Sequence, residues 1–506
     1  MDAEQWLKLQ NGSDIRGIAL NGIEGETVNL DEDRANCIGQ AFAVWLSQRL
    51  SMPFDQLRIS VGRDSRISGP MLSQSLCEGL MARQARVTDF GLASTPAMFV
   101  STISNEQSIK PSFHGAIMIT ASHLPFNRNG FKFFTDQGGL EKQDITKLLT
   151  LASSCISMVC ENKSSQLDFM AVYAAGLVEK VRRGIEHAAH YQAPLSDLKI
   201  LVDAGNGAGG FFVDRVLKPL GADTTGSQFL EPDGRFPNHV PNPEDAAAMQ
   251  SIRDAVLTHQ ADFGIIFDTD VDRSAAVDHQ GQTLNRNRLI ALISAILIRQ
   301  HPGSTIVTDS ITSDGLTDFI EIELKGKHHR FKRGYKNVIN EAIRLNQQGV
   351  FSPLAIETSG HAALKENHFL DDGAYLITKL LIELAKAKLN SQTLGDLISG
   401  LKEPVEDKEI RYRIEQENFQ LYGQKVLDEL KQFVIEQGDW IEVPKNHEGV
   451  RVKCNSVDEQ GWFLLRLSLH DPVLALNVES NIQGGSAAIL KKLTPFISRF
   501  NYLVER

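Results

Sequence analysis

The chain has 506 residues, of which 42% are hydrophobic and 23% are charged, and its formal net charge at pH 7 is −11. This length is too great for one hydrophobic core, so we expect several domains with an ordinary soluble globular composition. The negative charge argues against nucleic acid as the main partner, and an anionic ligand would need a local basic site or a metal ion.

We expect neither disulfide bonds nor a membrane segment. The five cysteines are odd in number and form no C-x-x-C motif, which favours a reducing compartment. The first residues, MDAEQWLKLQNGSD, lack a basic stretch followed by an apolar core, so no signal peptide is predicted. The longest apolar stretch, residues 289–298, is about half of what spans a bilayer, and we predict a buried helix there.

Strands alternate with helices in the first part of the chain. Residues 57–62 and 87–90 are predicted strands, and residues 68–84 form a predicted helix with leucines at every fourth position from Leu72. Pro96 stands where the first turn of another helix is expected. This alternation predicts a largely parallel sheet with helices on its faces.

A polar turn follows the next predicted strand, residues 116–119. Ser122 and His123 open that turn, and Pro125, Asn127 and Gly130 continue it. The serine therefore lies at the carboxyl end of a strand, where α/β folds bind ligands. An isolated Ser-His pair would more simply be two ordinary loop residues.

A second α/β segment carries a glycine-rich turn. A helix is predicted over residues 170–187 and a strand over residues 198–203, and Gly205, Gly207 and Gly210 satisfy G-x-G-x-x-G directly after the strand. This spacing is found in dinucleotide-binding turns, but the same glycines serve any strand-to-helix turn that packs closely.

Acidic residues follow the predicted strand 262–267 at alternate positions: Asp268, Asp270 and Asp272. Alternate residues of an extended segment point the same way, so we expect three carboxylates on one side, suited to a hard cation. An EF-hand loop is rejected because its glycine and glutamate positions hold Arg273 and His279.

Further α/β elements and a last, strand-rich part are predicted downstream. The predicted strands are residues 304–309, 354–356, 450–454, 462–467 and 473–478, and the predicted helices are residues 374–389 and 486–500.

Two of these stretches, TASHLPFNRNGFKF and DTDVDR, together resemble the signatures of the α-D-phosphohexomutase superfamily. The usual form of the first is T-A-S-H-N-P followed by N-G-x-K, so Leu124 stands where the family has asparagine. Supporting resemblances are SDIRG at residues 13–17, GRDSR at 62–66, DAGNG at 203–207, and ETSGH at 357–361.

The resemblance implies an α/β fold of four domains around a central cleft, with three related α/β units containing mixed sheets and a C-terminal α+β domain. The implied domains are residues 1–160 with the phosphoserine loop, 161–283 with the metal loop, 284–395 with the sugar-binding loop, and 396–506 with the phosphate-binding loop.

The resemblance also implies an isomerase that interconverts hexose 1-phosphate and hexose 6-phosphate, a phosphomannomutase/phosphoglucomutase. Ser122 would carry the phosphoryl group, a hexose 1,6-bisphosphate would be intermediate and activator, and Mg²⁺ would be held by the three aspartates and by Ser122. The implied catalytic residues are Ser122, Arg16, Lys132 and His361. The implied substrate-binding residues are Arg273, Lys336, Glu357, Ser359, Arg466 and Ser468.

One loop departs from the family. The expected R-P-S-G-T-E-P is replaced by RLSLHDP at residues 466–472, so Leu469 and His470 stand in place of Gly-Thr. Gln483, Gly484, Gly485 and Ser486 could instead offer N–H groups to an anion, or could simply cap a helix.

Three alternatives stay open on the sequence: a phosphoglucosamine mutase, a non-catalytic sugar-phosphate-binding homologue, and a dinucleotide-dependent oxidoreductase. The expected partner is a hexose phosphate rather than nucleic acid or a membrane, and the expected form is a cytoplasmic monomer or homodimer.

Overall fold

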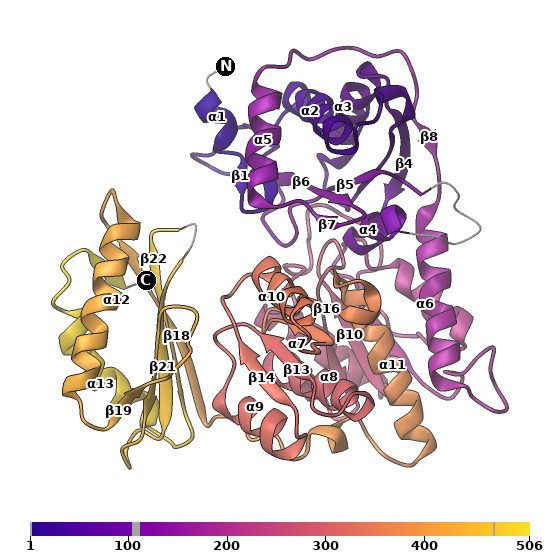
Figure 1. Ribbon diagram of the computed structural model, residues 1–506. Helices are drawn as coiled ribbons and strands as arrows, with labels where there is room; N and C mark the ends of the chain where they lie inside the picture. The colour runs from indigo at the N-terminus through magenta and orange to yellow at the C-terminus, as the bar shows by residue number, and fades with distance from the viewer. Residues whose placement is uncertain (1–2, 104–111, 469–470, 506) are drawn as a thin grey trace. The chain divides into compact units, whose positions relative to one another are not determined.

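The computed structural model (Figure 1) describes residues 3–103, 112–468 and 471–505. The chain divides into two compact units. The first unit comprises Met1–Asn285, Ser359–Ala362 and Leu370–Leu394, and the second comprises Arg286–Thr358, Ala363–Phe369 and Gly395–Arg506. Within the described residues, the helices are all too short or too polar to cross a lipid bilayer.

A mixed sheet forms the N-terminal part of the first unit. Its order is β1-β2-β6-β5-β3-β4-β8, with β7 attached to β6. Strands β5, β3, β4 and β8 are parallel neighbours, whereas β6, β2 and β1 continue the sheet in antiparallel pairs. The strands are β1 Gln10–Asn11, β2 Asp14–Ile18, β3 Arg58–Arg63, β4 Arg86–Leu92, β5 Gly115–Ile119, β6 Arg128–Thr135, β7 Gly138–Gly139 and β8 Ser165–Gln166.

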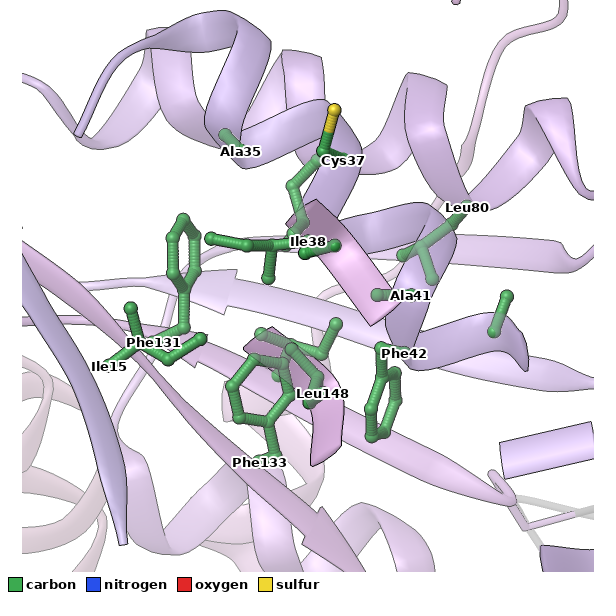
Figure 2. Packing of buried hydrophobic residues seen from close by; sticks show 14 of the residues in the cluster. Ile15, Ala35, Cys37, Ile38, Ala41, Phe42, Leu80, Phe131, Phe133 and Leu148 are labelled. Atoms are coloured by element: carbon green, nitrogen blue, oxygen red, sulfur yellow. The ribbon is translucent and has the colours of Figure 1, made fainter. Parts of the chain in front are cut away.

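Helices α2, α3 and α5 bury one face of this sheet (Figure 2). Phe131 and Phe133 of β6 project toward Ile38 and Phe42 of α2, and the rings of Phe42 and Phe133 lie 5.0 Å apart. The helices of this part are α1 Ala3–Leu7, α2 Glu32–Leu50, α3 Gly69–Ala82, α4 Thr95–Ile103 and α5 Lys142–Ser153. The predicted alternation of strands and helices is confirmed, although the antiparallel strands make the sheet mixed rather than parallel throughout.

The second sheet of the first unit has the order β12-β11-β10-β9, in which only the β9–β10 pair is parallel among the described strands. Its strands are β9 Ile200–Asp203, β10 Phe263–Phe267, β11 Ser274–Asp278 and β12 Thr283–Leu284. The accompanying helices are α6 Phe169–Ile185, α7 Ala246–His259 and α11 Gly373–Leu389. The apolar side of α7 packs on β9, β10 and β11.

In the second unit, β13 lies between β14 and β15 and is parallel to both. Helix α8 covers the stretch predicted to be a buried helix, and its residues from Leu289 to Ile298 are indeed buried. The elements are α8 Arg286–Gln300, β13 Thr305–Thr308, α9 Asp314–Asp318, β14 Lys327–Arg330, α10 Tyr335–Gln347 and β15 Leu354–Ile356. Strand β16, Ala362–Leu364, begins at the boundary between the two units, and β17, Leu370–Asp371, belongs to the first unit.

The C-terminal domain is an antiparallel sheet covered by two helices. The strand order is β19-β20-β21-β22-β18-β23, and α12 and α13 contribute to one core with that sheet. Its elements are β18 Glu406–Ile414, α12 Phe419–Glu436, β19 Trp440–Glu442, β20 Val450–Cys454, β21 Gly461–Leu467, β22 Val473–Ser480, α13 Gly485–Ile497 and β23 Leu503–Glu505. The α+β character predicted for this domain therefore matches its strands and helices.

The four domain boundaries stay predictions. Strand β8, Ser165–Gln166, still pairs with β4 of the first sheet, so this sheet continues past residue 160, where the first boundary is expected. The chain also returns to the first unit at Ser359 and again at Leu370. The four predicted domains are consecutive segments of the chain, whereas the two compact units are not.

Helices α2 and α3 approach each other closely because glycines face each other's backbones. A Cβ at Gly79 would lie 2.0 Å from the carbonyl oxygen of Asn36, and one at Gly39 would lie 2.3 Å from that of Leu76. A Cβ this close to a carbonyl oxygen would force the two helix backbones apart, so only glycine fits where α2 and α3 cross.

We expect Gly79→Ala to lower the free energy of unfolding by about 1–3 kcal/mol, because the added methyl group meets rigid backbone. Chemical denaturation measures the change. The matched control is Gly176→Ala in α6, where an added Cβ meets nothing within 4 Å. That change should raise the free energy of unfolding by about 0.4–1 kcal/mol. Equal effects of the two substitutions would contradict the packing argument.

Candidate active site

Ser122 lies in the turn after β5 with its backbone in the left-handed region, at φ 49°. This conformation is uncommon for residues other than glycine. Its N–H donates to the Thr120 hydroxyl at 2.8 Å, and its hydroxyl lies 3.0 Å from a carboxylate oxygen of Asp268. The serine is thus presented at the end of a buried strand, as the sequence predicts, and faces the acidic turn.

Two arginines hold the backbone of this turn. Arg66 is fully buried and donates to four carbonyl oxygens, those of Ser122, Leu124, Pro125 and Arg128. Arg16 of β2 donates to the carbonyl of Thr120 and to the Asp14 carboxylate. Because carbonyl groups accept these bonds, the side chain of Leu124 takes no part in them.

The three aspartates do converge, but not for the predicted reason. Residues 268–273 form a tight turn rather than an extended segment, and Val271 within it has φ 67°. The alternation argument is therefore wrong, since the backbone folds to bring the carboxylates together. Oxygen atoms of Asp268, Asp270 and Asp272 all lie within 4.8 Å of one another, and all three residues are buried.

The carboxylate cluster shows the chemistry of a hard-cation site. Among the described residues, Oδ1 of Asp270 and Oδ1 of Asp272 are buried and lack a hydrogen-bond partner. Buried carboxylate oxygens left without donors are costly, and a divalent cation with oxygen ligands would satisfy them. Burial and the other two carboxylates raise the pKa of Asp268 well above its usual value, which a cation would reverse.

Lys132 of β6 and Arg273 provide the positive charge in this cluster. Lys132 pairs with Asp272 and, at 2.8 Å, with Asp270. Burial would lower the pKa of Lys132, but the two carboxylates raise it well above its usual value. The lysine is therefore an ammonium at neutral pH, suited to donating rather than accepting a proton.

Arg273 links the acidic turn to the serine. Its side chain contacts Asp268 at 3.3 Å, the Ser122 hydroxyl at 3.3 Å and Nδ1 of His123 at 2.7 Å. Burial and Arg273 lower the pKa of His123 to about 3, so the ring is neutral with its Nδ1 already accepting a hydrogen bond. His123 is therefore a poor general base for the neighbouring serine.

His361 is held as a cation near the same cluster. Its Nδ1 pairs with the carboxylate of Asp371, whose other oxygen accepts from the Ala362 N–H at 3.0 Å. Burial opposes the charged ring, but Asp371 and Asp272 raise the pKa of His361 to about 9. Ser359, two residues earlier, is buried in the same unit, and Gly360 between them has φ 94°.

The remaining predicted substrate residues belong to the second unit. Glu357 is buried and accepts from the Gly334 N–H at 2.6 Å. Lys336 lies in the first turn of α10, and Arg466 is the last residue but one of β21, with 9% of its surface exposed. Burial, followed by the neighbouring Arg333, lowers the pKa of Arg466.

The loop of residues 466–472, which differs from the family's pattern, is held by hydrogen bonds of Ser468. Ser468 donates its N–H to Val473 at 2.9 Å, and its hydroxyl accepts from the N–H of Asp471 at 3.2 Å. Leu469 and His470 lie outside the described residues. At the start of α13, the Glu406 carboxylate accepts from the N–H groups of Gly484 and Ser486. The chain's own carboxylate therefore occupies the alternative anion position.

The glycine-rich turn after β9 packs against the chain itself. A Cβ at Gly207 would lie 2.8 Å from Thr269, and one at Gly210 would lie 2.4 Å from the Leu230 carbonyl. Asp203, which precedes the turn, accepts from His239, Gln228 and Ser251. These contacts support the close-packing interpretation over the dinucleotide interpretation.

Two contributors to the site were not predicted. The Thr95 hydroxyl donates to Asp270, and Asp371 holds His361. A sequence signal exists for both, since Thr95-Pro96 begins a helix and Asp371-Asp372 precedes one. Neither of these helix-start patterns indicates which distant side chain Thr95 or Asp371 contacts.

Comparison with known proteins identifies the family of the chain. Models of the phosphoglucomutase/phosphomannomutase alpha/beta/alpha domains I, II and III match residues 8–153, 175–281 and 285–404. The chain is 30% identical over 469 residues to a phosphomannomutase/phosphoglucomutase of Pseudomonas putida, covering 92% of this chain and 91% of that protein. It is 28% identical to a phosphoglucomutase of Neisseria gonorrhoeae, covering 96% of both.

A crystal structure of a phosphoglucomutase/phosphomannomutase family protein from Burkholderia thailandensis matches with a TM-score of 0.78 and 26% identity, covering 99% of this chain and 98% of that chain. The chain belongs to the phosphoglucomutase/phosphomannomutase family. The predicted superfamily, the α/β fold with mixed sheets and the phosphomutase class are confirmed.

We expect Asp270→Asn to weaken Mg²⁺ binding by at least about tenfold, because it removes a charged ligand from a buried oxygen site. Isothermal titration with MgCl₂ measures the affinity. The control is Asp254→Asn on the exposed side of α7, which should leave Mg²⁺ binding unchanged. Equal Mg²⁺ affinity of the two variants would contradict the metal assignment.

Proposed function

We propose that this protein is a phosphohexomutase that moves a phosphoryl group between O1 and O6 of a hexose through a phosphorylated Ser122. The supporting observation is the half-buried Ser122 hydroxyl, which lies just after β5 and 3.0 Å from the carboxylate cluster of residues 268–272. A serine beside a hard-cation site is suited to phosphoryl transfer, in which positioning and neutralisation of the phosphoryl oxygens supply most of the catalysis.

In this proposal, phosphorylated Ser122 gives its phosphoryl group to hexose 1-phosphate or hexose 6-phosphate, and the free serine oxygen then takes back the other phosphate of the 1,6-bisphosphate. Asp268, Asp270 and Asp272 would hold Mg²⁺, which withdraws charge from the phosphoryl oxygens when bound. Arg273 contacts the serine oxygen and would neutralise the same group.

Proton transfer is assigned to Lys132 and His361, both cationic at neutral pH. As a cation, each would donate its proton to the oxygen that leaves, and the neutral form left behind would accept the proton of the hydroxyl that attacks. Arg16 would act through the Thr120 carbonyl to fix the loop of Ser122. Glu357 and Ser359 would bind sugar hydroxyls, and these roles rest on the family's E-x-S-G-H pattern.

Arg466, Ser468 and Lys336 are proposed to hold the phosphate that is not being transferred. The preferred substrates are mannose and glucose phosphates, because the chain's relatives include phosphomannomutase/phosphoglucomutase proteins and phosphoglucomutases. Glucosamine phosphate is the second choice.

We also infer a cytoplasmic location, in keeping with cysteines that are all free in the described structure. The inferred form is a monomer or homodimer.

We expect Ser122→Ala to lower mutase turnover on the order of a thousandfold or more, because no covalent phosphoenzyme can form. Mass spectrometry of the wild type should find one phosphoryl group on the peptide containing Ser122. A coupled assay with glucose, mannose and glucosamine phosphates, each with a trace of its bisphosphate, measures turnover. Ser153→Ala, at the end of α5, is the control and should be unaffected. Near-normal activity of Ser122→Ala would exclude the mechanism.

We expect Arg466→Ala to raise KM for the sugar phosphate and lower kcat. Hydrogen bonds to a charged group contribute roughly 1.5–3 kcal/mol, which corresponds to about 10- to 150-fold in affinity. Replacing Leu469 and His470 by the family's Gly-Thr pair should preserve or raise activity. If Arg466→Ala changes neither parameter, phosphate is bound elsewhere. If the wild type transfers phosphate to none of the three hexoses, the non-catalytic alternative holds.

A further inference from the structure

Arg451 of β20 is a fully buried cation that joins the C-terminal domain to the preceding α/β domain within the second unit. Only 1% of its surface is exposed, and its guanidinium lies 3.5 Å from the ring centre of Trp462. It donates to the carbonyls of Ser310 and Thr312 at 2.8 and 3.0 Å and to the Asp314 carboxylate at 2.9 Å. A buried guanidinium that donates to several acceptors at once strongly constrains the relative position of the two domains.

Glu448 makes the second attachment, three residues earlier. Its carboxylate accepts from the hydroxyl of Ser310 and from the N–H of Arg333 at 3.1 Å. Asn446 shapes this segment by donating to the carbonyls of Glu448 and Gly449. Ser310 is therefore held twice, through its carbonyl by Arg451 and through its hydroxyl by Glu448.

The loop that is held, residues 309–313, also contacts the proposed sugar-binding segment of this unit. Asp309 accepts from the hydroxyl of Thr358 at 2.7 Å, next to Glu357. Gly334, adjacent to the Arg333 that bonds Glu448, donates its N–H to Glu357. The C-terminal domain therefore attaches at Ser310 and Arg333. Each of these is adjacent in sequence to a residue that bonds the Glu357 loop.

The same segment also touches the strand that carries Arg466. In the sheet register, Val450 faces Leu465 and Arg451 faces Leu464. Gly449 has φ 58°, and a Cβ there would lie 2.2 Å from the Leu465 carbonyl and 2.8 Å from Cα of Arg466. Glycine is required at this point because the segment lies directly against Arg466.

We propose that residues 446–451 form an interdomain clamp that sets the position of the phosphate-binding Arg466 relative to the sugar-binding Glu357. Glu448 and Arg451 are its positioning residues, and neither contacts the substrate in this assignment. The proposal rests on the proposed sugar-phosphate binding of this unit. A hexose phosphate must meet both ends of the site at once, so a fixed separation of the two ends selects its length.

The test measures binding in a Ser122→Ala background, which removes phosphoryl transfer. Glucose 6-phosphate and mannose 6-phosphate are titrated calorimetrically into the parent, Arg451→Met and Glu448→Gln. Each change should weaken binding by about tenfold or more, because a charge-assisted contact between the domains is lost. The matched controls are Arg413→Met and Glu442→Gln on exposed parts of the same domain, and they should bind like the parent.

A double-mutant cycle separates positioning from general stability. If Arg451 positions Arg466, the loss of affinity caused by Arg466→Ala should be smaller by at least about threefold when Arg451→Met is already present. Thermal unfolding reports whether each variant folds. If Arg451→Met is unfolded, Arg451→Lys replaces it, because lysine keeps the charge but lacks the planar set of donors. The same loss of sugar-phosphate affinity and the same coupling to Arg466→Ala are expected.

Unchanged affinity of the folded clamp variants, or strictly additive effects in the cycle, would overturn the clamp alone. Tighter binding by Glu448→Gln would also overturn it, since this carboxylate would then compete with phosphate. Failure of the parent to bind any hexose phosphate would overturn the clamp and the proposed function together.

Discussion

The site depends on the burial of three carboxylates beside a serine. Asp268, Asp270 and Asp272 are held within 4.8 Å of one another, and Lys132 and Arg273 make their ion pairs. Removing such charges from water is costly unless each is paired or ligated. This requirement explains why a strand lysine is fully buried, why Thr95 donates to Asp270, and why two carboxylate oxygens are left for a cation.

Both units also contain a buried arginine that donates to main-chain carbonyl groups. Arg451 reaches carbonyl groups of the preceding domain, much as Arg66 gathers carbonyl groups around Ser122 in the first unit. In both places a planar guanidinium organises a loop at the carboxyl end of a parallel strand, β13 in one case and β5 in the other. In both loops the buried cation acts together with a loop hydroxyl, that of Thr120 or of Ser310.

Much of the fold and of the candidate site could be predicted from the sequence because the signals are local. The apolar run before Ser122, the burial of α8 and the elements β15 and β20 follow from short-range patterns. The acidic turn shows the limit, since its carboxylates converge through a left-handed Val271 that no alternation pattern anticipates. Pairings such as His361 with Asp371, or Arg451 with Ser310, depend on which strands become neighbours, and spacing alone does not encode this.

The arrangement around Arg66 also bears on how the loop can evolve. Because its four acceptors are main-chain carbonyls, the bonds from Arg66 to residues 122–128 do not involve the side chain of Leu124. Substitutions there exchange the surface beside the nucleophile without altering the scaffold beneath it. Position 124 is therefore a suitable first position for randomisation when a library of altered sugar selectivity is built.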